Sequence, residues 1–363
     1  MNSRIVVSGV NLTEMGPLAV FKDALQSLAA YCNGRNQIIA LVHRSSLFDI
    51  PGIDFIEFPT IKASWLRRVY FEFWQCRAIS NDLNPRLWLS MDNITPNVIA
   101  ETQAVYCHNP SSFYQFRFQD LWFDWKFGLF TLFFRHLYGI NIKRNDHVVV
   151  QQNWIRQSFE RTYRVRNVIV AHPDVEAVAT LADRTSTDDV YRFFYPAYPR
   201  TFKNAETVLS AAHLLEKSGF RKFELWLTFD DDVNRYARSI KKRFAHVSAV
   251  RWLGLLPRQQ VFARYEAADC LLFPSKLETW GMPITEFKAT GKPILAADLP
   301  YAHETVGSYN RAAFFDPGDP VHLADLMKAA ALREPVFLIT REEKIREPYA
   351  RNWNDLWSRL IPQ

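Results

Sequence analysis

The stretch from Phe273 to Pro293, FPSKLETWGMPITEFKATGKP, carries the signals of a strand, a loop, a helix and the start of a second strand. The short apolar run that ends at Pro274 is typical of a buried strand. Pro283 favours a helix start, because its fixed φ and missing N–H cost nothing at the first helical position. Gly291 then ends the helix, and the chain turns into the next strand. The stretch therefore predicts one strand-and-helix unit of a parallel α/β sheet.

Two glutamates flank the turn inside this stretch: Glu278 lies in the loop and Glu286 in the first turn of the expected helix. Between them, Gly281 lets the backbone approach a ligand closely, and the free N–H groups of a helix start attract phosphate. Carboxylates accept hydrogen bonds from vicinal hydroxyls, which a sugar nucleotide carries on both its sugar and its ribose. The pattern favours a sugar-nucleotide site. The alternative is that Glu286 only complements the helix dipole and that Glu278 is a solvated loop residue.

The same alternation of strands and helices continues along all 363 residues. The expected strands start at Arg4, Gln37, Asp54, Arg86, Ala104 and His147 in the first half, and at Arg192, Phe223, Val250, Cys270 and Pro293 in the second. Short apolar runs separated by helical patterns indicate parallel sheets covered on both faces. With a polar interval over residues 182–189 between the halves, the sequence predicts an α/β fold of two domains, residues 1–175 and 190–340, that face each other across a cleft.

The overall composition is that of an ordinary globular protein with a net charge of +6. A modest positive excess spread over the chain does not decide between nucleic acid, anionic lipid and phosphorylated ligands. No charged-then-apolar signal pattern follows Met1, so we expect the protein to stay in the cytosol. The four cysteines match no metal-ligand or redox spacing, and we expect reduced, buried thiols at Cys32, Cys76, Cys107 and Cys270.

Aromatic residues make up 15% of the chain, and many of them fall between Phe113 and Tyr138. Lys126, Arg135 and His136 interrupt the apolar runs of this segment, so no stretch of roughly 18 uncharged apolar residues can span a bilayer. Two interpretations stay open with equal weight. The segment is either a helix that lies in the interface of an anionic membrane or a helix that packs inside the protein.

The surroundings of the glutamate pair resemble the signature of a known enzyme family. ETWGMPITE, from Glu278 to Glu286, follows an FPS strand end and is similar to the paired-glutamate signature of the family-4 retaining glycosyltransferases. Three further segments resemble the same family in their order and spacing: RWLGLLPRQQVFARYEAADCLLFPS (251–275), AADLPYAHETVG (296–307) and FFDPGDPVHLADLM (314–327). The resemblance covers most of the second half. It implies the GT-B fold, in which two Rossmann-like domains face each other and the second holds the nucleotide sugar.

The resemblance also implies donor-binding roles in the second half. Glu278 would bind hydroxyls of the transferred sugar and Glu286 those of the ribose. The sugar and the diphosphate would meet the backbone of Trp280, Gly281 and Met282.

A basic pair in FYPAYPRTFKNAETVLSA (194–211) completes the expected donor site. By resemblance, Lys203 and Arg200 would neutralise the diphosphate as it leaves, which is where such a site gains its rate. The family form has an Arg five residues before the Lys, whereas Arg200 precedes Lys203 by three, so the assignment rests mainly on Lys203. The alternative is that both are surface residues before a helix.

The first half resembles the family more loosely. SGVNLTEMGPLAVF (8–21) is similar to the family's N-terminal glycine loop, with only Gly16 where a Gly-Gly pair is usual. In YCHNP, His108 follows a strand at a place where the family has a histidine near the reacting sugar. A structural histidine is the alternative.

Polar residues that end another strand of the first half complete the expected site. Asp92, Asn93 and Thr95 in SMDNITPNV would contact the acceptor, although Thr95 with Pro96 is equally a helix cap. Residues 341–363 contain REEKIREPYARNWNDLWSRL, which resembles the family's last helix, and this helix crosses back to the first domain.

Asp230, Asp231 and Asp232 are similar to the acidic triplets that hold a metal and a diphosphate in a different glycosyltransferase fold. They precede the amphipathic stretch VNRYARSIKKRF, so a helix N-cap with dipole complementation is the favoured interpretation. We therefore expect neither a catalytic metal nor a cofactor.

As a whole, the sequence resembles bacterial enzymes that build O-antigen, capsule or related surface polysaccharide. This resemblance implies that a hexose-type sugar, with mannose or rhamnose as first guesses, moves with retention from a nucleotide-diphosphate sugar to a lipid-linked glycan acceptor. The expected catalytic residues are Glu278, His108 and Lys203. The expected place of work is the cytoplasm, at the inner face of the cytoplasmic membrane, with an anionic membrane surface as a partner and no nucleic acid.

Two further classes of function stay open at this point. One is another chemistry on the same fold, a sugar-nucleotide epimerase or a phosphorylase. The other is a non-catalytic, partner-binding protein in a polysaccharide assembly complex.

Overall fold

The computed structural model describes residues 3–114, 118–173, 189–334, 337 and 344–361. The chain divides into two compact units. Unit 1 comprises Met1–Tyr114, Leu129–Asp174 and Ile345–Gln363, and unit 2 comprises Gln115–Gly128 and Val175–Lys344. Of the polar interval expected between the halves, residues 182–188 lie outside the described residues.

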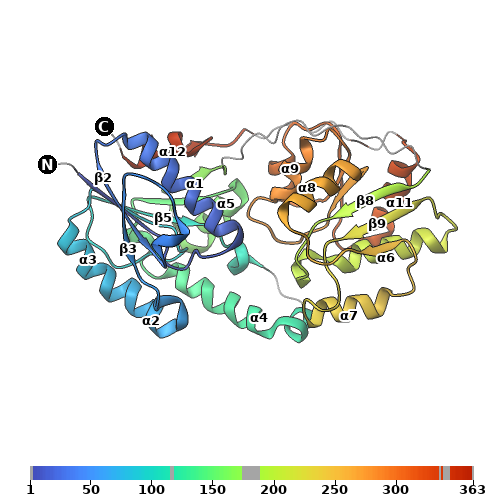
Figure 1. Cartoon of the computed structure of the whole chain (residues 1–363), viewed down its shortest axis with the longest axis horizontal. Helices are drawn as coiled ribbons and strands as arrows, with labels where there is room; N and C mark the ends of the chain where they lie inside the picture. The colour runs from blue at the N-terminus through green and yellow to red at the C-terminus, as the bar shows by residue number, and fades with distance from the viewer. Residues whose placement is uncertain (1–2, 115–117, 174–188, 335–336, 338–343, 362–363) are drawn as a thin grey trace. The chain divides into compact units, whose positions relative to one another are not determined.

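Unit 1 is built on an eight-stranded sheet whose paired strands are parallel (Figure 1). The spatial order is β14-β7-β6-β5-β4-β1-β2-β3. Its strands are β1 (Arg4–Ser8), β2 (Gln37–Val42), β3 (Ile53–Glu57), β4 (Leu87–Ser90), β5 (Thr102–Cys107), β6 (His147–Val150), β7 (Val168–Ala171) and β14 (Tyr349–Ala350). The inner strands are buried almost throughout, as uninterrupted apolar runs in a parallel sheet require.

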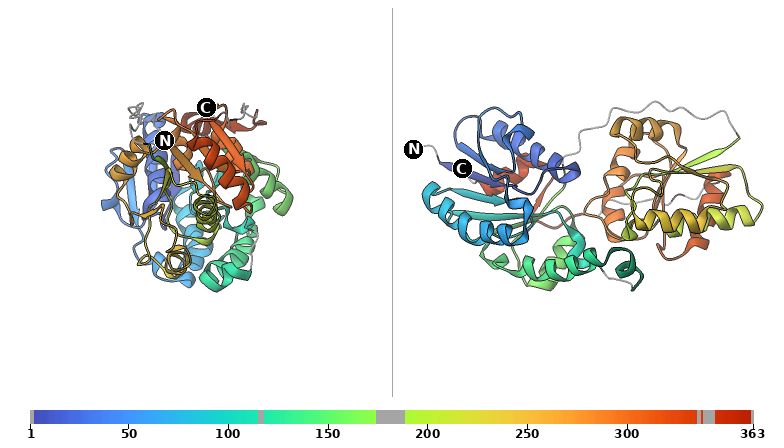
Figure 2. Two further views of the ribbon diagram at one scale, coloured as in Figure 1. Left: turned by 90° about the vertical axis from the view of Figure 1, so that its right-hand side faces the viewer. Right: turned by 60° about the horizontal axis from the view of Figure 1, so that its bottom comes forward.

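Helices cover both faces of this sheet (Figure 2). They are α1 (Met15–Cys32), α2 (Trp65–Tyr70), α3 (Cys76–Leu83), α5 (Asn153–Tyr163), α12 (Trp353–Leu360) and the part of α4 (Phe118–Gly139) from Leu129 on, since the earlier part of α4 belongs to unit 2. A π-helical turn, η3 (Phe71–Gln75), joins α2 to α3 without a break, and π-turns of this kind are frequent at functional sites. Short 3₁₀ turns are η1 (Ser45–Leu47), η2 (Ile61–Ala63), η4 (Pro110–Phe113) and η5 (Ile142–Arg144).

Unit 2 repeats the architecture with six parallel strands in the order β10-β9-β8-β11-β12-β13. Its strands are β8 (Tyr191–Tyr195), β9 (Phe223–Leu227), β10 (Val250–Trp252), β11 (Cys270–Phe273), β12 (Ile294–Ala297) and β13 (Ala312–Phe315). Its helices are η6 (Thr201–Lys203), α6 (Ala205–Lys217), α7 (Arg235–Phe244), α8 (Arg258–Ala267), α9 (Met282–Lys288), α10 (Pro300–Val306) and α11 (Pro320–Ala331).

Both sheets share the Rossmann strand order. Its topological switch point, which we call the chain reversal, lies beside the first strand, where successive strands stop being added on one side of the sheet and start being added on the other. The reversal lies between β1 and β4 in unit 1 and between β8 and β11 in unit 2. Loops that leave the carboxyl ends of strands at such a point diverge and leave room for a ligand. The loops after β1, β4, β8 and β11 are therefore where a site belongs in each unit.

The helix expected over residues 341–360 is shorter than predicted. Residues 338–343 lie outside the described residues, Tyr349–Ala350 forms β14 at the edge of the unit 1 sheet, and α12 begins only at Trp353. The side chain of Asn352 accepts a hydrogen bond from the Asp355 backbone N–H, which caps the helix at that point.

Two capping predictions are wrong. No helix begins at Thr95, because residues 91–101 form no helix and the Thr95 hydroxyl instead accepts a hydrogen bond from the Asn145 side chain at 2.7 Å. The aspartates at 230–232 do not cap α7, since Asn234 does so through the Ala237 backbone N–H.

The aromatic segment after Phe113 forms α4, which is buried on one face and exposed on another, and contact with a membrane stays a prediction. Phe134, Leu137 and Tyr138 are buried in the core of unit 1, whereas Trp122, Trp125, Leu129 and Phe133 are exposed.

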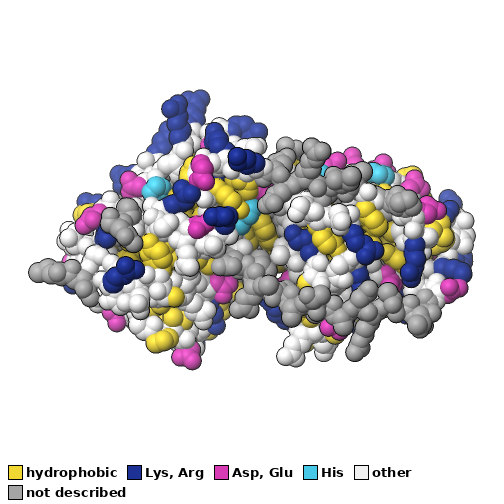
Figure 3. Space-filling model, turned by 90° about the horizontal axis from the view of Figure 1, so that it is seen from above, with side chains coloured by type: hydrophobic (Ala, Val, Ile, Leu, Met, Phe, Trp, Pro, Cys, Tyr) yellow, Lys and Arg dark blue, Asp and Glu magenta, His cyan; other side chains and the backbone are white. Residues whose placement is uncertain are grey.

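Among the described helices, none is both long and apolar enough to cross a bilayer. On the face seen in Figure 3, Lys and Arg side chains are spread among hydrophobic and acidic ones. All four cysteines are buried free thiols.

Candidate functional site

In unit 2, the two neighbouring strands at the chain reversal bring Lys203 and Glu278 together. Lys203 ends η6 after β8, and Glu278 lies in the loop after β11. The Lys203 Nζ atom is 2.5 Å from Glu278 Oε1, and the two side chains are only 22% and 13% exposed. A half-buried ion pair at the carboxyl ends of parallel strands offers both a cation for a phosphate and an acceptor for hydroxyls.

The backbone on either side of this ion pair is held by buried polar groups. The Tyr195 hydroxyl donates to the Lys203 carbonyl oxygen at 2.7 Å. Asn204, at a left-handed φ of 64°, donates from its buried side chain to the carbonyl oxygens of Pro274, at 3.1 Å, and Pro317, at 2.8 Å. One amide thus ties together the loops that follow β8, β11 and β13, which fixes the place of the pair.

Gly281 stands immediately before α9 with a φ of 89°, a left-handed conformation that favours glycine. A Cβ atom there would lie 3.2 Å from the ring of Phe273, so the position is also sterically tight. Its neighbours differ in exposure: Met282 is partly exposed, while Trp280 is nearly buried and donates from Nε1 to the Thr285 hydroxyl at 2.9 Å.

Glu286 lies in the second turn of α9 rather than the first, because the helix begins one residue before Pro283. Its side chain is nearly buried and is engaged on both oxygens. The Tyr265 hydroxyl donates to Oε2 at 2.9 Å, and the exposed guanidinium of Arg258 reaches Oε1 at 3.2 Å. Burial raises the pKa of Tyr265, and the Glu286 charge raises it further, so the phenol stays a donor.

Arg200, the second expected cation, occupies the N-cap position of η6 and is exposed. Its guanidinium carbon lies 5.5 Å from the centre of the Tyr198 ring. Sequence reasoning missed Arg258 and Tyr265, although both lie in the segment 251–275 that carries the family resemblance.

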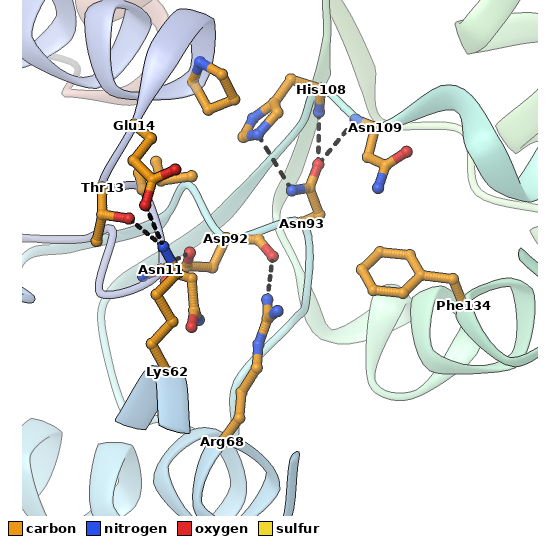
Figure 4. Close-up of a pocket in the computed structure, with 12 residues that line it drawn as sticks. Asn11, Thr13, Glu14, Lys62, Arg68, Asp92, Asn93, His108, Asn109 and Phe134 are labelled. Carbon is orange, nitrogen blue, oxygen red and sulfur yellow. Dashed lines mark hydrogen bonds and ion pairs between the residues drawn. The ribbon is translucent and has the colours of Figure 1, made fainter. Parts of the chain in front are cut away.

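Unit 1 has a separate pocket of about 220 Å³ at its own chain reversal (Figure 4). Its walls come from the loop after β1 with the start of α1, the loops after β4 and β5, and helices on one face of the sheet. The lining residues are Asn11, Leu12, Thr13, Glu14, Pro17, Lys62, Arg68, Asp92, Asn93, His108, Asn109 and Phe134.

Three of the predicted first-half residues meet in this pocket, namely Asp92, Asn93 and His108. The other two are not part of its lining. Gly16 is exposed in the first turn of α1, and a Cβ atom there would meet nothing, so its position does not require a glycine for space. Thr95 is buried and bonded to Asn145.

The charges around the pocket are partly buried. Arg68 donates to the backbone carbonyl oxygen of Asp92 at 2.7 Å, and the Asp92 carboxylate accepts from the Asn11 backbone N–H at 3.2 Å. Burial raises the pKa of Asp92, against the lowering effect of Arg68. At the pocket edge, Lys62 is ion-paired with Glu14 at 3.1 Å.

No group of three or more His, Cys, Asp or Glu side chains within the described residues is arranged to hold a metal ion. Asp230, the first residue of the acidic triplet, is instead ion-paired with Lys241, and Asp231 lies 3.6 Å from the same amine. Lys241 comes from the last turn of α7, so the triplet braces that helix against the loop before it.

Comparison with known proteins finds a family match for part of the chain. Residues 183–351 match the model of the glycosyl transferases group 1. The chain is 29% identical over 121 residues to the O-antigen chain mannosyltransferase B of Escherichia coli, a match that covers 32% of this chain and 30% of that protein. It is 22% identical over 201 residues to the O-antigen chain mannosyltransferase RfbU of Salmonella typhimurium, which covers 52% of each. The matches thus span about a third to a half of the length of these relatives.

Solved structures resemble the fold over nearly the whole chain. Sucrose-phosphate synthase from Thermosynechococcus elongatus superposes with a TM-score of 0.66 at 14% identity, covering 91% of this chain and 90% of that one. The lipopolysaccharide outer core galactosyltransferase WaaB gives a TM-score of 0.65 at 12% identity, with coverage of 91% and 90%. The α/β fold of two Rossmann-like units expected for GT-B proteins is thereby confirmed. Residues 183–351 thus match the glycosyl transferases group 1, and the likeness of fold to the solved glycosyltransferase structures extends over nearly the whole chain.

Proposed function

We propose that this protein is a retaining glycosyltransferase that moves a hexose-type sugar from a nucleotide-diphosphate sugar to a lipid-linked glycan in surface polysaccharide biosynthesis. The observation that carries the proposal is the half-buried pair of Lys203 and Glu278 at the chain reversal of unit 2. The names of the relatives, O-antigen chain mannosyltransferases, favour mannose as the sugar to test first and O-antigen as the product class.

The donor is proposed to bind in unit 2. Without a ligand, Lys203 and Glu278 satisfy each other's charge. A diphosphate offers Lys203 a stronger anionic partner, which releases Glu278 to accept hydrogen bonds from hydroxyls of the sugar. Arg200, exposed beside Lys203 in the same loop, would add a second positive charge. Glu286 would accept from the ribose, once its ion pair with Arg258 rearranges.

In the proposed reaction, the bond between the anomeric carbon and the diphosphate oxygen breaks, and the electron pair stays on the diphosphate. Lys203 stabilises that developing negative charge, which is a larger effect in a half-buried site than in water. The acceptor hydroxyl attacks from the same face of the sugar, and its proton passes to the departing diphosphate. These steps need no side chain of the protein as a base.

The acceptor is proposed to bind in the unit 1 pocket. The lining is mostly of polar and charged side chains that accept or donate hydrogen bonds, and its apolar members are Leu12, Pro17 and Phe134. Sugar hydroxyls both donate and accept, so a pocket with carboxylates, amides and a histidine suits a glycan end better than an apolar molecule.

An enzyme with a lipid-linked acceptor works at a membrane surface, and unit 1 exposes a group of apolar and aromatic residues that suits contact with one. Trp65 and Leu66 on α2 and Tyr70 and Trp74 around η3 are exposed, and the Trp65 ring contacts the exposed Phe133 ring of α4 with centroids 6.5 Å apart. Amphipathic aromatic rings favour the boundary between headgroups and acyl chains. We call these five residues the aromatic surface of unit 1 and propose that it contacts the bilayer.

Unit 2 offers basic charge for the same purpose. Arg235, Arg238 and Lys242 recur at helical spacing on α7 and are exposed, whereas Lys241 is already paired with Asp230. Arg243 of the same helix and the exposed Trp122 of α4 line a pocket of about 260 Å³. Each basic residue near an anionic leaflet contributes about 1 kcal/mol of attraction.

The proposal is tested by thermal unfolding with UDP, GDP, dTDP, CMP and their common sugars, followed by transfer to a lipid-linked acceptor. One nucleotide should raise the Tm, because a ligand that binds only the folded state stabilises it. Lys203→Ala and Glu278→Gln should lower turnover by about 10²- to 10³-fold. Lys222→Ala is the matched control, since Lys222 forms a 2.7 Å ion pair with Asp189 in the same unit, where both are exposed.

Other outcomes would select the alternative functions. A free epimerised sugar, or cleavage that depends on phosphate, would point to an epimerase or a phosphorylase. The absence of any nucleotide-induced shift together with the absence of transfer would contradict the proposal and favour a non-catalytic, partner-binding protein.

A further inference from the structure

Asn93 is the centre of the hydrogen-bond network in the unit 1 pocket (Figure 4). Its side-chain oxygen accepts from the backbone N–H groups of His108, at 2.7 Å, and Asn109, at 2.9 Å, and from the Tyr138 hydroxyl at 3.1 Å. The two backbone groups can only donate, so a flipped amide would set donors against donors. The orientation of the Asn93 amide is therefore fixed.

The fixed amide turns its nitrogen toward the imidazole of His108. The Asn93 Nδ2 atom lies 3.3 Å from His108 Nε2. An amide nitrogen has hydrogens to donate and no lone pair to accept with, so Nε2 must be the acceptor. A neutral imidazole that accepts at Nε2 carries its proton on Nδ1, and a doubly protonated ring would oppose N–H to N–H at this contact.

We propose that Asn93 is a positioning residue that holds His108 as a neutral imidazole with its proton on Nδ1, where it donates a hydrogen bond to an oxygen of the ligand in the pocket. Nδ1 is buried and has no hydrogen-bond partner among the described residues, while the ring lines the pocket. A sugar hydroxyl or a phosphate oxygen supplies the acceptor that this N–H needs. The statement about the ligand rests on the proposed function, whereas the tautomer is a property of the protein alone.

The surroundings of the ring favour the same state. Burial lowers the pKa of His108 to about 4, and the positive charge of Arg68 lowers it further. The acid beside it in the pocket, Asp92, accepts from the Asn11 backbone, and its own pKa is raised by burial. The Tyr106 ring, with its centroid 6.0 Å away, is an uncharged neighbour. Near neutral pH His108 therefore donates a hydrogen bond but does not act as a proton source for the departing diphosphate.

The first test is long-range ¹H–¹⁵N NMR of the full chain, in which the two ring nitrogens report where the proton lies. The His108 signals are assigned by their loss in His108→Gln. The expected result is a protonated Nδ1 and an unprotonated Nε2 throughout pH 5.5 to 8. A proton on Nε2, or a titration near the ordinary histidine value of about 6.5, would overturn the proposal.

Asn93→Asp is the decisive variant, because it keeps the oxygen that binds the backbone N–H groups and replaces the donor that faces Nε2 with an acceptor. The proton should move to Nε2, and the His108 titration should rise by about one to three pH units. Asn97→Asp is the matched control, since the Asn97 side chain contacts Arg144 and the backbone of Phe73 instead. Equal effects of the two variants on His108 would also overturn the proposal.

The second test follows the ligand. In Asn93→Asp, the pH profile of kcat/KM should gain an inflection at the raised His108 pKa, whereas the parent protein and Asn97→Asp show none from that group. If the His108 proton moves to Nε2 in Asn93→Asp but the pH profile of kcat/KM does not change, the proposed contact between His108 and the ligand is wrong. If no donor gives turnover in any variant, the proposed function fails, and the NMR result still decides the role of Asn93.

Discussion

Glu72 is a buried acid on the π-helical turn η3, and neither of its carboxylate oxygens has a hydrogen-bond partner among the described residues. The Nε atom of Arg68 lies 4.0 Å from Oε1. Burial raises the pKa of Glu72 to about 8, the nearby Asp92 carboxyl acts in the same direction, and Arg68 opposes both. In the folded protein Glu72 therefore keeps its proton at neutral pH, one turn of helix from a residue that lines the unit 1 pocket.

This raised pKa makes the stability of unit 1 depend on pH. The unfolded chain releases the Glu72 proton above about pH 4.3, whereas the folded chain holds it to about pH 8, so the folded state loses stability as the pH rises through that window. Glu72→Gln removes the penalty. At pH 8 the variant should be more stable than the parent by about 4–5 kcal/mol, and at pH 5 by only about 1 kcal/mol.

Urea unfolding of both proteins at pH 5 and pH 8 measures the effect. Glu101→Gln, at an exposed site of the same unit, is the control and should leave both midpoints unchanged. If the stability advantage of Glu72→Gln does not grow between pH 5 and pH 8, Glu72 ionises in the folded protein near its ordinary pKa, and the prediction is wrong.

At the residue scale, sequence reasoning finds motif residues but not their partners. Glu278 and Lys203 are predicted from a signature and lie 2.5 Å apart in the structure. Arg258 and Tyr265 were not selected, because nothing in their spacing shows that α8 turns them toward Glu286. Glu72 was also missed, since an acid beside exposed aromatic residues looks solvated until the fold buries it. The chemical roles predicted for the motif residues stay predictions.

At the scale of single elements, the strands are predicted best. A buried parallel strand is an uninterrupted apolar run, so β11 was expected to start at Cys270 and does. Helix ends are predicted less well, because a cap depends on which side chain reaches which N–H group. Asn234 rather than the aspartates at 230–232 caps α7, and α12 starts well after the predicted helix because Asn352 caps it.

The element α12 belongs to the core of unit 1, although it follows all of unit 2 in the sequence. Leu356 and Trp357 are fully buried, and the Trp357 indole donates to the Ser27 hydroxyl of α1 at 3.2 Å. Just before it, the buried guanidinium of Arg156 donates to the carbonyl oxygens of Arg346, at 2.6 Å, and Pro348, at 2.7 Å. The helix and β14 are thus held in place by both apolar burial and charged hydrogen bonds.

Leu356→Ala should lower the free energy of unfolding of unit 1 by about 2–5 kcal/mol, because it removes fully buried methyl groups and leaves a cavity. Hydrogen exchange followed by mass spectrometry should show faster exchange in β7 and α1 and no change in the strands of unit 2. Leu332→Ala, at a half-exposed leucine after α11, is the matched control and should change exchange nowhere. Uniform acceleration in both units would contradict the assignment of α12 to unit 1.

At the scale of the whole molecule, the division into two units was expected but its bounds were not. Gln115–Gly128 belongs to unit 2 although it precedes much of unit 1 in the sequence. The reason is aromatic packing, since Phe123 meets Tyr236 with ring centroids 5.6 Å apart and Phe127 meets Phe202 at 5.3 Å. A polar linker is visible in a sequence, whereas a contact between two distant aromatic residues is not.

The aromatic surface of unit 1 gives a prediction for the molecule as a whole. Leu66, which is 81% exposed, should enter the headgroup region of an anionic vesicle, so Leu66→Glu should weaken vesicle binding by about 10- to 100-fold. Cosedimentation with phosphatidylglycerol vesicles measures the binding. The difference between 50 and 300 mM salt gives the contribution of charge to that binding. Leu332→Glu, which changes an exposed leucine of unit 2, should bind like the parent. Equal binding by all three proteins would exclude this surface.

The pairing of β14 with β7 has a consequence for the order of events during synthesis. Residues 345–363 leave the ribosome only after the whole of unit 2, so a nascent chain that has already formed strands β1 to β7 presents the backbone of β7 without its neighbour. An unpaired strand edge is a template for pairing with another chain. We expect chaperone dependence and self-association to be concentrated in this interval, which ends when β14 pairs with β7 and α12 packs against α1.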